Sequence, residues 1–178
     1  MKRVTTLIAS LLVVDLAANV VATAAGIAAE PPPSAAKPTS VDQLYALYRD
    51  KTWVWPDGGG YFARNGQFAA WSGNGDAAGY AEGRWWLSGP EGKFCFQATW
   101  RTMKGNWSKR DCFDHRVVGD VIYQRKEPSG AWYKFKNSPS DARDEFHALK
   151  DGDLVSDSVK RIKALISANG GAAVPAPL

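Results

Sequence analysis

The sequence predicts a mainly β fold, in which an antiparallel meander of about eight strands forms a small lipocalin-like barrel or a strongly curled sheet. A short N-terminal helix and C-terminal helices accompany the strands. Two observations predict this fold. Between residues 52 and 135, short segments rich in aromatic and β-branched residues show the alternation of strands. Clusters of Gly, Pro, Asn and Asp separate them, and such short links favour a meander over the Greek-key crossings of a sandwich.

A short helix opens the predicted domain, a single β-rich unit over residues 41–169. Ser40, followed three residues later by Gln43, forms a capping box. Leu44 and Leu47 then fall on one helical face, which is the pattern of a helix that packs against a core.

Turn residues divide the rest of the chain into strands. Asn65-Gly66 is the pair preferred in a two-residue type I′ turn and predicts a hairpin, while the glycines of residues 58–60 predict a loop. The predicted strands are 52–55, 61–64, 67–72, 80–87, 93–102, 110–117, 121–125 and 132–135.

Two helical segments end the predicted domain. Residues 140–149 form a weak helix, whereas residues 155–168 form a stronger one, with Val159, Ile162 and Ile166 on one face. We expect the second helix to plug or pack against one end of the sheet.

The N-terminal residues predict export. A positive start at Lys2 and Arg3, an apolar stretch and the small residues around Ala24 indicate a cleaved signal peptide over residues 1–24. Asp15 interrupts the apolar stretch, which argues against a permanent membrane anchor. The expected location is periplasmic or secreted. A Pro/Ala-rich linker over residues 25–40 and a disordered tail over residues 170–178 flank the domain.

The charge pattern argues against a nucleic acid partner. The formal net charge is +4, and charges of both signs are scattered along the chain. A protein that follows a phosphate backbone needs a stripe of Lys and Arg, and the sequence has no such run.

The two cysteines predict a disulfide. In an oxidising compartment an even cysteine count usually means a bridge, and Cys95 and Cys112 lie on neighbouring predicted strands. The alternative is a metal site that also uses His115. Residues three apart on a strand point to opposite faces, so Cys112 and His115 should not share a metal, and no metal or cofactor is expected.

Eight tryptophans suggest either a filled β core or an aromatic pocket for a flat ligand. Alternation places Trp85 and Trp100 on core faces, which favours the first interpretation. Trp86 is the exception, because its face carries polar and aromatic side chains. The predicted ligand-binding residues are therefore Tyr80, Glu82, Arg84 and Trp86, provided that this face looks into the barrel; if it looks outward, it is a solvated face with cross-strand ion pairs.

The sequence holds no recognisable catalytic constellation, and no enzyme is predicted. His115 and His147 lie in different elements, away from any nucleophile motif. The leading hypothesis is a non-catalytic module that binds a small ligand or interacts with the envelope. The alternative is a protein-protein module, such as an inhibitor or an assembly factor of envelope enzymes. A third is a hydrolase of envelope glycans that uses Glu82 and Asp114, which requires the two carboxyl groups within about 5–10 Å.

Several motifs resemble an uncharacterised family of secreted bacterial proteins, the domain of unknown function 995. They are Lys51-Thr52-Trp53-Val54-Trp55, Gly58-Gly59-Gly60-Tyr61-Phe62, Phe68-Ala69-Ala70-Trp71-Ser72-Gly73, Glu82-Gly83-Arg84-Trp85, Cys95-Phe96, Ala98-Thr99-Trp100, Cys112-Phe113 and Tyr123-Gln124-Arg125. The likeness runs from about Leu44 to Val155. It implies an exported protein, and it implies no activity.

Overall fold

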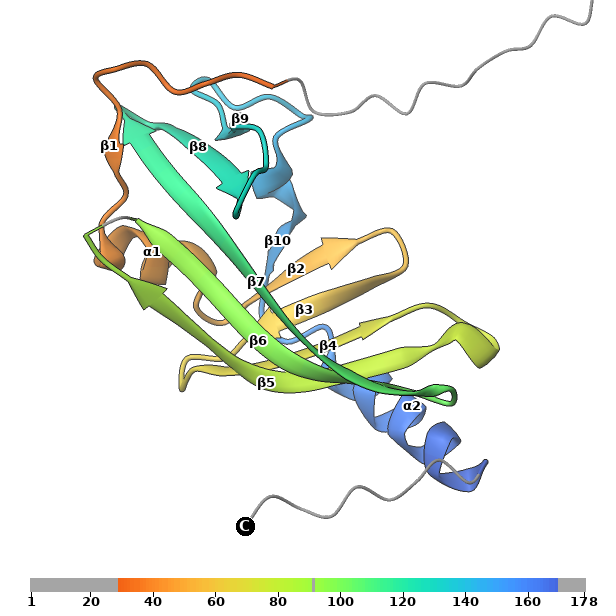
Figure 1. Cartoon of the computed structure of the whole chain (residues 1–178). Coiled ribbons are helices and arrows are strands. Elements are labelled where there is room, and N and C mark those ends of the chain that lie inside the picture. The colour runs from red at the N-terminus through yellow and green to blue at the C-terminus, as the bar shows by residue number, and fades with distance from the viewer. Residues whose placement is uncertain (1–28, 91, 170–178) are drawn as a thin grey trace, which may run out of the picture.

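A computed structural model describes residues 29–90 and 92–169. Their main feature is one antiparallel sheet of ten strands, curled into a half-barrel (Figure 1). The strands in chain order are β1 (Lys37–Pro38), β2 (Lys51–Trp55), β3 (Gly58–Phe62), β4 (Gln67–Ser72), β5 (Gly79–Ser88), β6 (Lys93–Thr102), β7 (Gly105–Val118), β8 (Val121–Lys126), β9 (Tyr133–Lys136) and β10 (Leu149–Asp151).

The predicted meander is confirmed. Strands β2 to β9 each pair with the next along the chain, while β10 pairs with β2 and β1 pairs with β7. All eight predicted strands occur. Strands β4 and β6 have the predicted ends, and the ends of the other six are shifted. The sequence prediction missed β1 and β10 because segments of two or three residues are too short to show alternation.

The inner face of the half-barrel holds the core. Helix α1 (Val41–Tyr48) begins with the predicted Ser40–Gln43 capping box and buries one face against this side of the sheet. The Tyr48 ring stacks on Phe94 with a centroid distance of 3.8 Å. Trp85 is buried here as predicted, and its indole N–H donates to the Ala63 carbonyl at 2.7 Å.

Helix α2 (Ser156–Ala168) covers part of the outer face. Ile162 and Ile166 pack against Ala78, Trp71 and Tyr80 of the β4–β5 region (Figure 1). The amphipathic helix predicted over residues 155–168 is thus confirmed. It lies across the outside of the sheet and so does not cover the concave side.

The weak helix predicted over residues 140–149 is wrong. The chain forms a single 3-10 turn, η2 (Glu145–Ala148), and then continues into β10. Upstream of it, the Asp144 carboxylate accepts hydrogen bonds from the Asn137 and Asp141 backbone amides. Side chains that bind local backbone amides compete with a regular helix. Turn η2 contacts β2, β9 and β10 and so bridges the two open ends of the sheet.

Two predicted turns also need correction. Residues 63–66 link β3 to β4 with a longer turn than type I′, because Gly66 alone takes the left-handed conformation at φ 81° and its N–H donates to Ala63. The glycines at 58–60 form strand β3 instead of a loop. A Cβ at Gly58 would lie 2.1 Å from the Trp71 carbonyl oxygen and 2.5 Å from the Trp55 indole nitrogen. One at Gly60 would lie 2.8 Å from the Phe68 ring. These glycines make room for aromatic rings, a role that composition alone does not reveal.

The linker predicted over residues 25–40 extends too far. Pro38 pairs with Arg116 in the sheet, the Glu30 N–H donates to the Trp132 carbonyl, and Thr39 is buried. Proline-rich chain still orders where a strand edge offers backbone partners. The predicted signal peptide and C-terminal tail lie outside the described residues.

Candidate ligand pocket on the concave face

The four residues predicted to bind a ligand lie on the outer face of β5. Two of them, Tyr80 and Glu82, contact helix α2. Lys163 places its Nζ 2.5 Å from the Glu82 carboxylate and 5.3 Å from the centre of the Tyr80 ring. Arg101 lies over the same ring at 5.7 Å. Tyr80 and Glu82 therefore contribute to holding α2 on the sheet.

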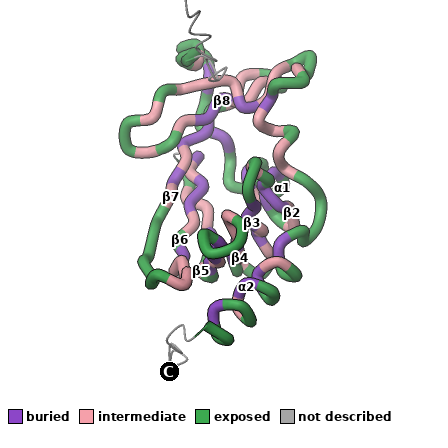
Figure 2. The backbone as a smooth tube through the Cα atoms, turned by 90° about the vertical axis from the view of Figure 1, so that its right-hand side faces the viewer, coloured by how far each residue is buried: buried purple, intermediate pink, exposed green. Residues whose placement is uncertain are grey.

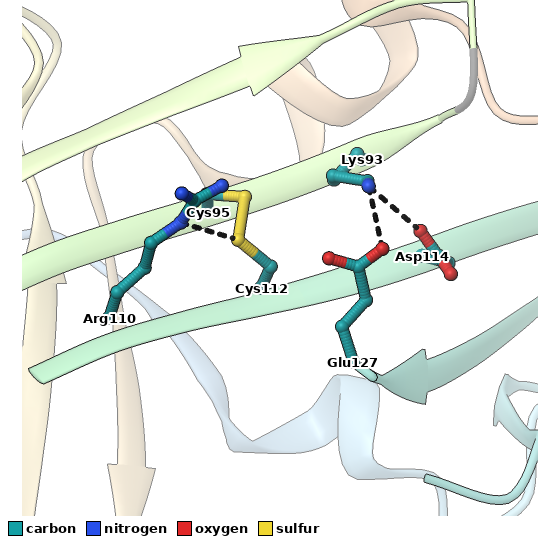
Figure 3. Close-up of a disulfide and its surroundings, with 6 residues drawn as sticks. All are labelled: Lys93, Cys95, Arg110, Cys112, Asp114 and Glu127. Atoms are coloured by element: carbon teal, nitrogen blue, oxygen red, sulfur yellow. Dashed lines mark hydrogen bonds and ion pairs between the residues drawn. A yellow bond between two sulfur atoms is a disulfide. The ribbon is translucent and has the colours of Figure 1, made fainter. Parts of the chain in front are cut away.

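Trp86 lies beside the disulfide. Cys95 and Cys112 form a bridge between β6 and β7, with a Cα–Cα distance of 4.1 Å, so the predicted pairing is confirmed. Arg110 lies 5.4 Å over the Trp86 ring and donates from Nε to the Cys112 sulfur at 3.3 Å (Figure 3). Trp86 and Arg110 thereby help to shield the bridge from solvent.

A hollow of about 350 Å³ remains on this outer face. Its side-chain lining comes mainly from Glu82, Arg84, Trp86, Gln97, Thr99 and Ser108. The surface is polar, and Arg84 has no ion-pair partner among the described residues. The outer face therefore combines a structural part near α2 with a hollow around Arg84.

The concave face holds a larger pocket of about 650 Å³. Its wall is aromatic, and the rings come from four strands, β2, β4, β6 and β7. The rings are those of Trp53, Trp55, Phe68, Phe96, Trp100, Trp107 and Phe113. Trp100 and Trp107 face one another across β6 and β7 with nearly parallel rings, 6.3 Å between centroids and 12° between planes. Such a wall suits a ligand with apolar or aromatic faces.

Polar groups stand at the rim of this pocket. The Asp111 carboxylate pairs with Lys126 at 2.6 Å and with Lys109 at 3.5 Å. Both ammonium groups remain half exposed, and they offer charge to an anionic part of a ligand. Asp57 also lines the pocket and accepts a hydrogen bond from Ser72 at 3.1 Å.

Glu145 brings a carboxyl group into the aromatic wall from turn η2. Burial raises its pKa, because charge is costly away from water. Hydrogen bonding with Tyr133 and Trp53 lowers the pKa and offsets part of this effect. A carboxyl group of this kind can orient a polar group of a bound ligand.

A buried polar network continues from this wall into the core. The Tyr133 hydroxyl donates to Gln124, whose Nε2 lies 2.8 Å from both the Tyr48 hydroxyl and His115 Nε2. His115 is fully buried, and burial lowers its pKa to about 3, although hydrogen bonding to the backbone at Phe113 and Gly92 offsets part of the change. The imidazole is therefore neutral at pH 7 and serves as an internal acceptor.

The pair Glu82 and Asp114 does not form a catalytic site. Glu82 lies opposite Thr99 and Asp114 lies opposite Lys93, so six residues of β6 separate them. At about 3.4 Å per residue the distance is roughly 20 Å, twice what a pair of glycosidase carboxyl groups allows. Asp114 also accepts a hydrogen bond from Arg125 at 2.8 Å, and Lys93 links Asp114 to Glu127 (Figure 3).

His115 also cannot join the cysteines in a metal site, since its ring faces the core while the disulfide lies on the outer side of β7. Among the residues that the structure describes, no cluster of three or more His, Cys, Asp or Glu side chains is arranged to hold a metal ion.

The ligand face predicted from the sequence lies on the outer side of the sheet, whereas the larger pocket lies on the concave side. The sequence assigns Trp100 to the core because its neighbours Phe94 and Phe96 are apolar. In the structure Phe94, Phe96 and Trp100 do face inward, but the rings do not fill the whole space inside the half-barrel, and a pocket remains. The run of glycines at 58–60, next to Trp53 and Trp55, could have indicated the pocket wall. Glycine is used where large rings need the space that a side chain would take.

Residues 12–155 match the model of the family described as "Protein of unknown function (DUF995)". The chain belongs to this family. The DUF995 match covers the strands that build the pocket, from β1 to β10. Comparison with curated proteins gives no significant match, and neither does comparison with solved structures.

The helices of this DUF995 protein are short. Within residues 29–90 and 92–169, none of them is long and apolar enough to cross a membrane.

Proposed function

We propose that this DUF995 protein is an exported, non-catalytic binding module that takes up a small molecule in the pocket of the half-barrel. One observation carries the proposal: a pocket of about 650 Å³ with seven aromatic side chains in its wall. Ligand sites combine such apolar walls with a few fixed polar groups, and Glu145, Lys109 and Lys126 supply these groups here.

The ligand class follows from the same groups. Four indole rings offer flat apolar faces, which suits an aromatic compound or the apolar face of a sugar ring. Half-exposed lysines at the rim favour a ligand whose outer end is anionic. Glu145 lines the same wall, and burial raises the pKa of its carboxyl group.

Export is supported by the disulfide. A bridge between Cys95 and Cys112 persists in an oxidising compartment and is reduced in the cytosol of most cells. The positively charged and then apolar N-terminus fits a signal peptide. These two features support our proposal that the protein acts in the periplasm or outside the cell.

Replacing Trp107 with alanine should weaken binding in the pocket by about 2- to 13-fold, the value of one aromatic contact of about 0.5–1.5 kcal/mol. The probe is 1-anilinonaphthalene-8-sulfonate, which has flat rings and one negative charge, and its fluorescence reports the affinity. Trp107 is 49% exposed, so this change should leave the fold intact.

The matched control is Trp132→Ala, which removes an indole that does not line the pocket. It should leave the affinity unchanged. Equal affinities of wild type and Trp107→Ala would contradict the proposal that the ligand binds in this pocket. Native mass spectrometry of protein purified gently from the periplasm would then show whether a cellular ligand of this class remains bound.

A further inference from the structure

A second binding surface lies along the free edge of β7. This strand pairs with β6 over residues 105–114, but β8 covers its other edge only from Phe113 onward. Residues 105–111 therefore form a strand edge of roughly 20 Å that no described residue pairs with. The edge belongs to the long β6–β7 hairpin, and its exposed residues are green along lower β7 in Figure 2.

The direction of the backbone groups on this edge follows from two hydrogen bonds. In an antiparallel ladder the N–H and C=O of one residue point to the same neighbouring strand, and successive residues alternate. The Cys112 carbonyl accepts from Glu127 on the β8 side, whereas the His115 N–H donates to Gly92 on the β6 side. By this alternation Asn106, Ser108 and Arg110 direct both of their backbone groups outward.

The side chains of the same strand alternate between the two faces. Trp107, Lys109 and Asp111 line the concave pocket, while Ser108 lines the outer hollow. A strand added at this edge would therefore place every second side chain next to the aromatic pocket. This is the arrangement by which extended peptides are recognised, with affinity from the main chain and specificity from alternate side chains.

Charge selects the kind of strand that fits. Lys104, Lys109, Arg110 and Lys126 surround the edge. The acidic side chains beside them are Asp111 and Glu127, and Glu127 pairs with Lys93. Two copies of this edge would bring like charges together, and lysines on edge strands work against such self-pairing. An acidic segment, in contrast, would gain from the same charges.

We propose that the free edge of β7 binds an extended, acidic polypeptide segment of a partner protein by adding it as a further strand. The site goes beyond the small-ligand pocket, with which it shares Trp107 and Lys109.

Ser108→Pro tests the proposal, because it removes an outward N–H and leaves the ladder to β6 intact. Random linear dodecamers on phage are selected against the full chain, and enriched peptides are synthesised and measured by fluorescence polarisation. We expect enriched sequences that alternate acidic with apolar residues. Ser108→Pro should weaken their binding at least tenfold, whereas the matched Ser108→Ala, which keeps the N–H, should change it less than twofold.

Amide hydrogen exchange on the wild type tests the same contact without a mutation. Bound peptide should protect the amides of Asn106, Ser108 and Arg110. Peptides that bind Ser108→Pro as tightly as wild type, or a selection that enriches nothing, would overturn the proposal. A dimer in sedimentation that Ser108→Pro dissociates would assign the edge to a second copy instead.

The small-ligand proposal is judged separately. Ser108 does not line the concave pocket, so Ser108→Pro should leave binding of 1-anilinonaphthalene-8-sulfonate unchanged. A failure of the peptide test therefore leaves the pocket result standing, and the reverse also holds.

Discussion

Replacing Cys95 and Cys112 together with alanine is expected to lower the free energy of unfolding by about 3 kcal/mol. The bridge joins residues 17 apart in sequence, and removing it gives the unfolded chain the freedom that this loop now restricts. Both cysteines are buried, so small replacements keep the site apolar. Urea denaturation followed by tryptophan fluorescence measures the change.

The native chain under reducing conditions provides the control for this prediction. With dithiothreitol present, wild type and the double variant should unfold at the same urea concentration, because neither then has a bridge. A double variant as stable as oxidised wild type would show that the β6–β7 ladder alone restricts the loop. If the disulfide contributes this much to the free energy of unfolding, the protein keeps its full stability only in an oxidising compartment.

The disulfide illustrates what alternation can predict. A period of two puts Cys95 and Cys112 on the same side of neighbouring strands and puts His115 on the other side, and the structure has both. The same rule correctly separated the buried Trp85 from Trp86 on the outer face. These predictions depend only on the alternation of side chains along a strand, which can be read from a single sequence.

The pocket could not be predicted in the same way. Whether inward-facing rings such as Trp100 fill a core or leave a cavity depends on how tightly the sheet curls. That curvature arises from all the strands together and from η2, which bridges β9 and β10. Glu145 was missed for a related reason. Its segment looked like a weak helix, and only the fold brings it beside Trp53.

Acid should destabilise the protein strongly through one buried residue. His115 has a pKa of about 3 in the fold, well below its ordinary value of 6.5, because it is fully buried. The folded state keeps the ring neutral, while the unfolded state binds a proton below pH 6.5. Stability from this difference is therefore complete above pH 6.5 and is lost as the pH falls toward 3, at about 1.4 kcal/mol per pH unit.

Between pH 7 and pH 4 the His115 contribution to the loss is about 3 kcal/mol. His115→Gln should remove this contribution, so its free energy of unfolding should fall less steeply over the same range. The slope is the quantity to compare, because the substitution also disturbs the hydrogen bonds with Tyr48 and Gln124 and lowers stability at every pH.

The matched control is His147→Gln, which removes the chain's other histidine from an exposed position. Its pH dependence should equal that of wild type. Parallel slopes for wild type and His115→Gln would mean that the ring takes up a proton in the folded state. The polar network that runs from His115 through Gln124 and Tyr133 to Glu145 at the pocket would then contain a positive charge. Because the folded state binds no proton at His115, we expect the network to remain neutral and to hold the pocket wall in one arrangement at physiological pH.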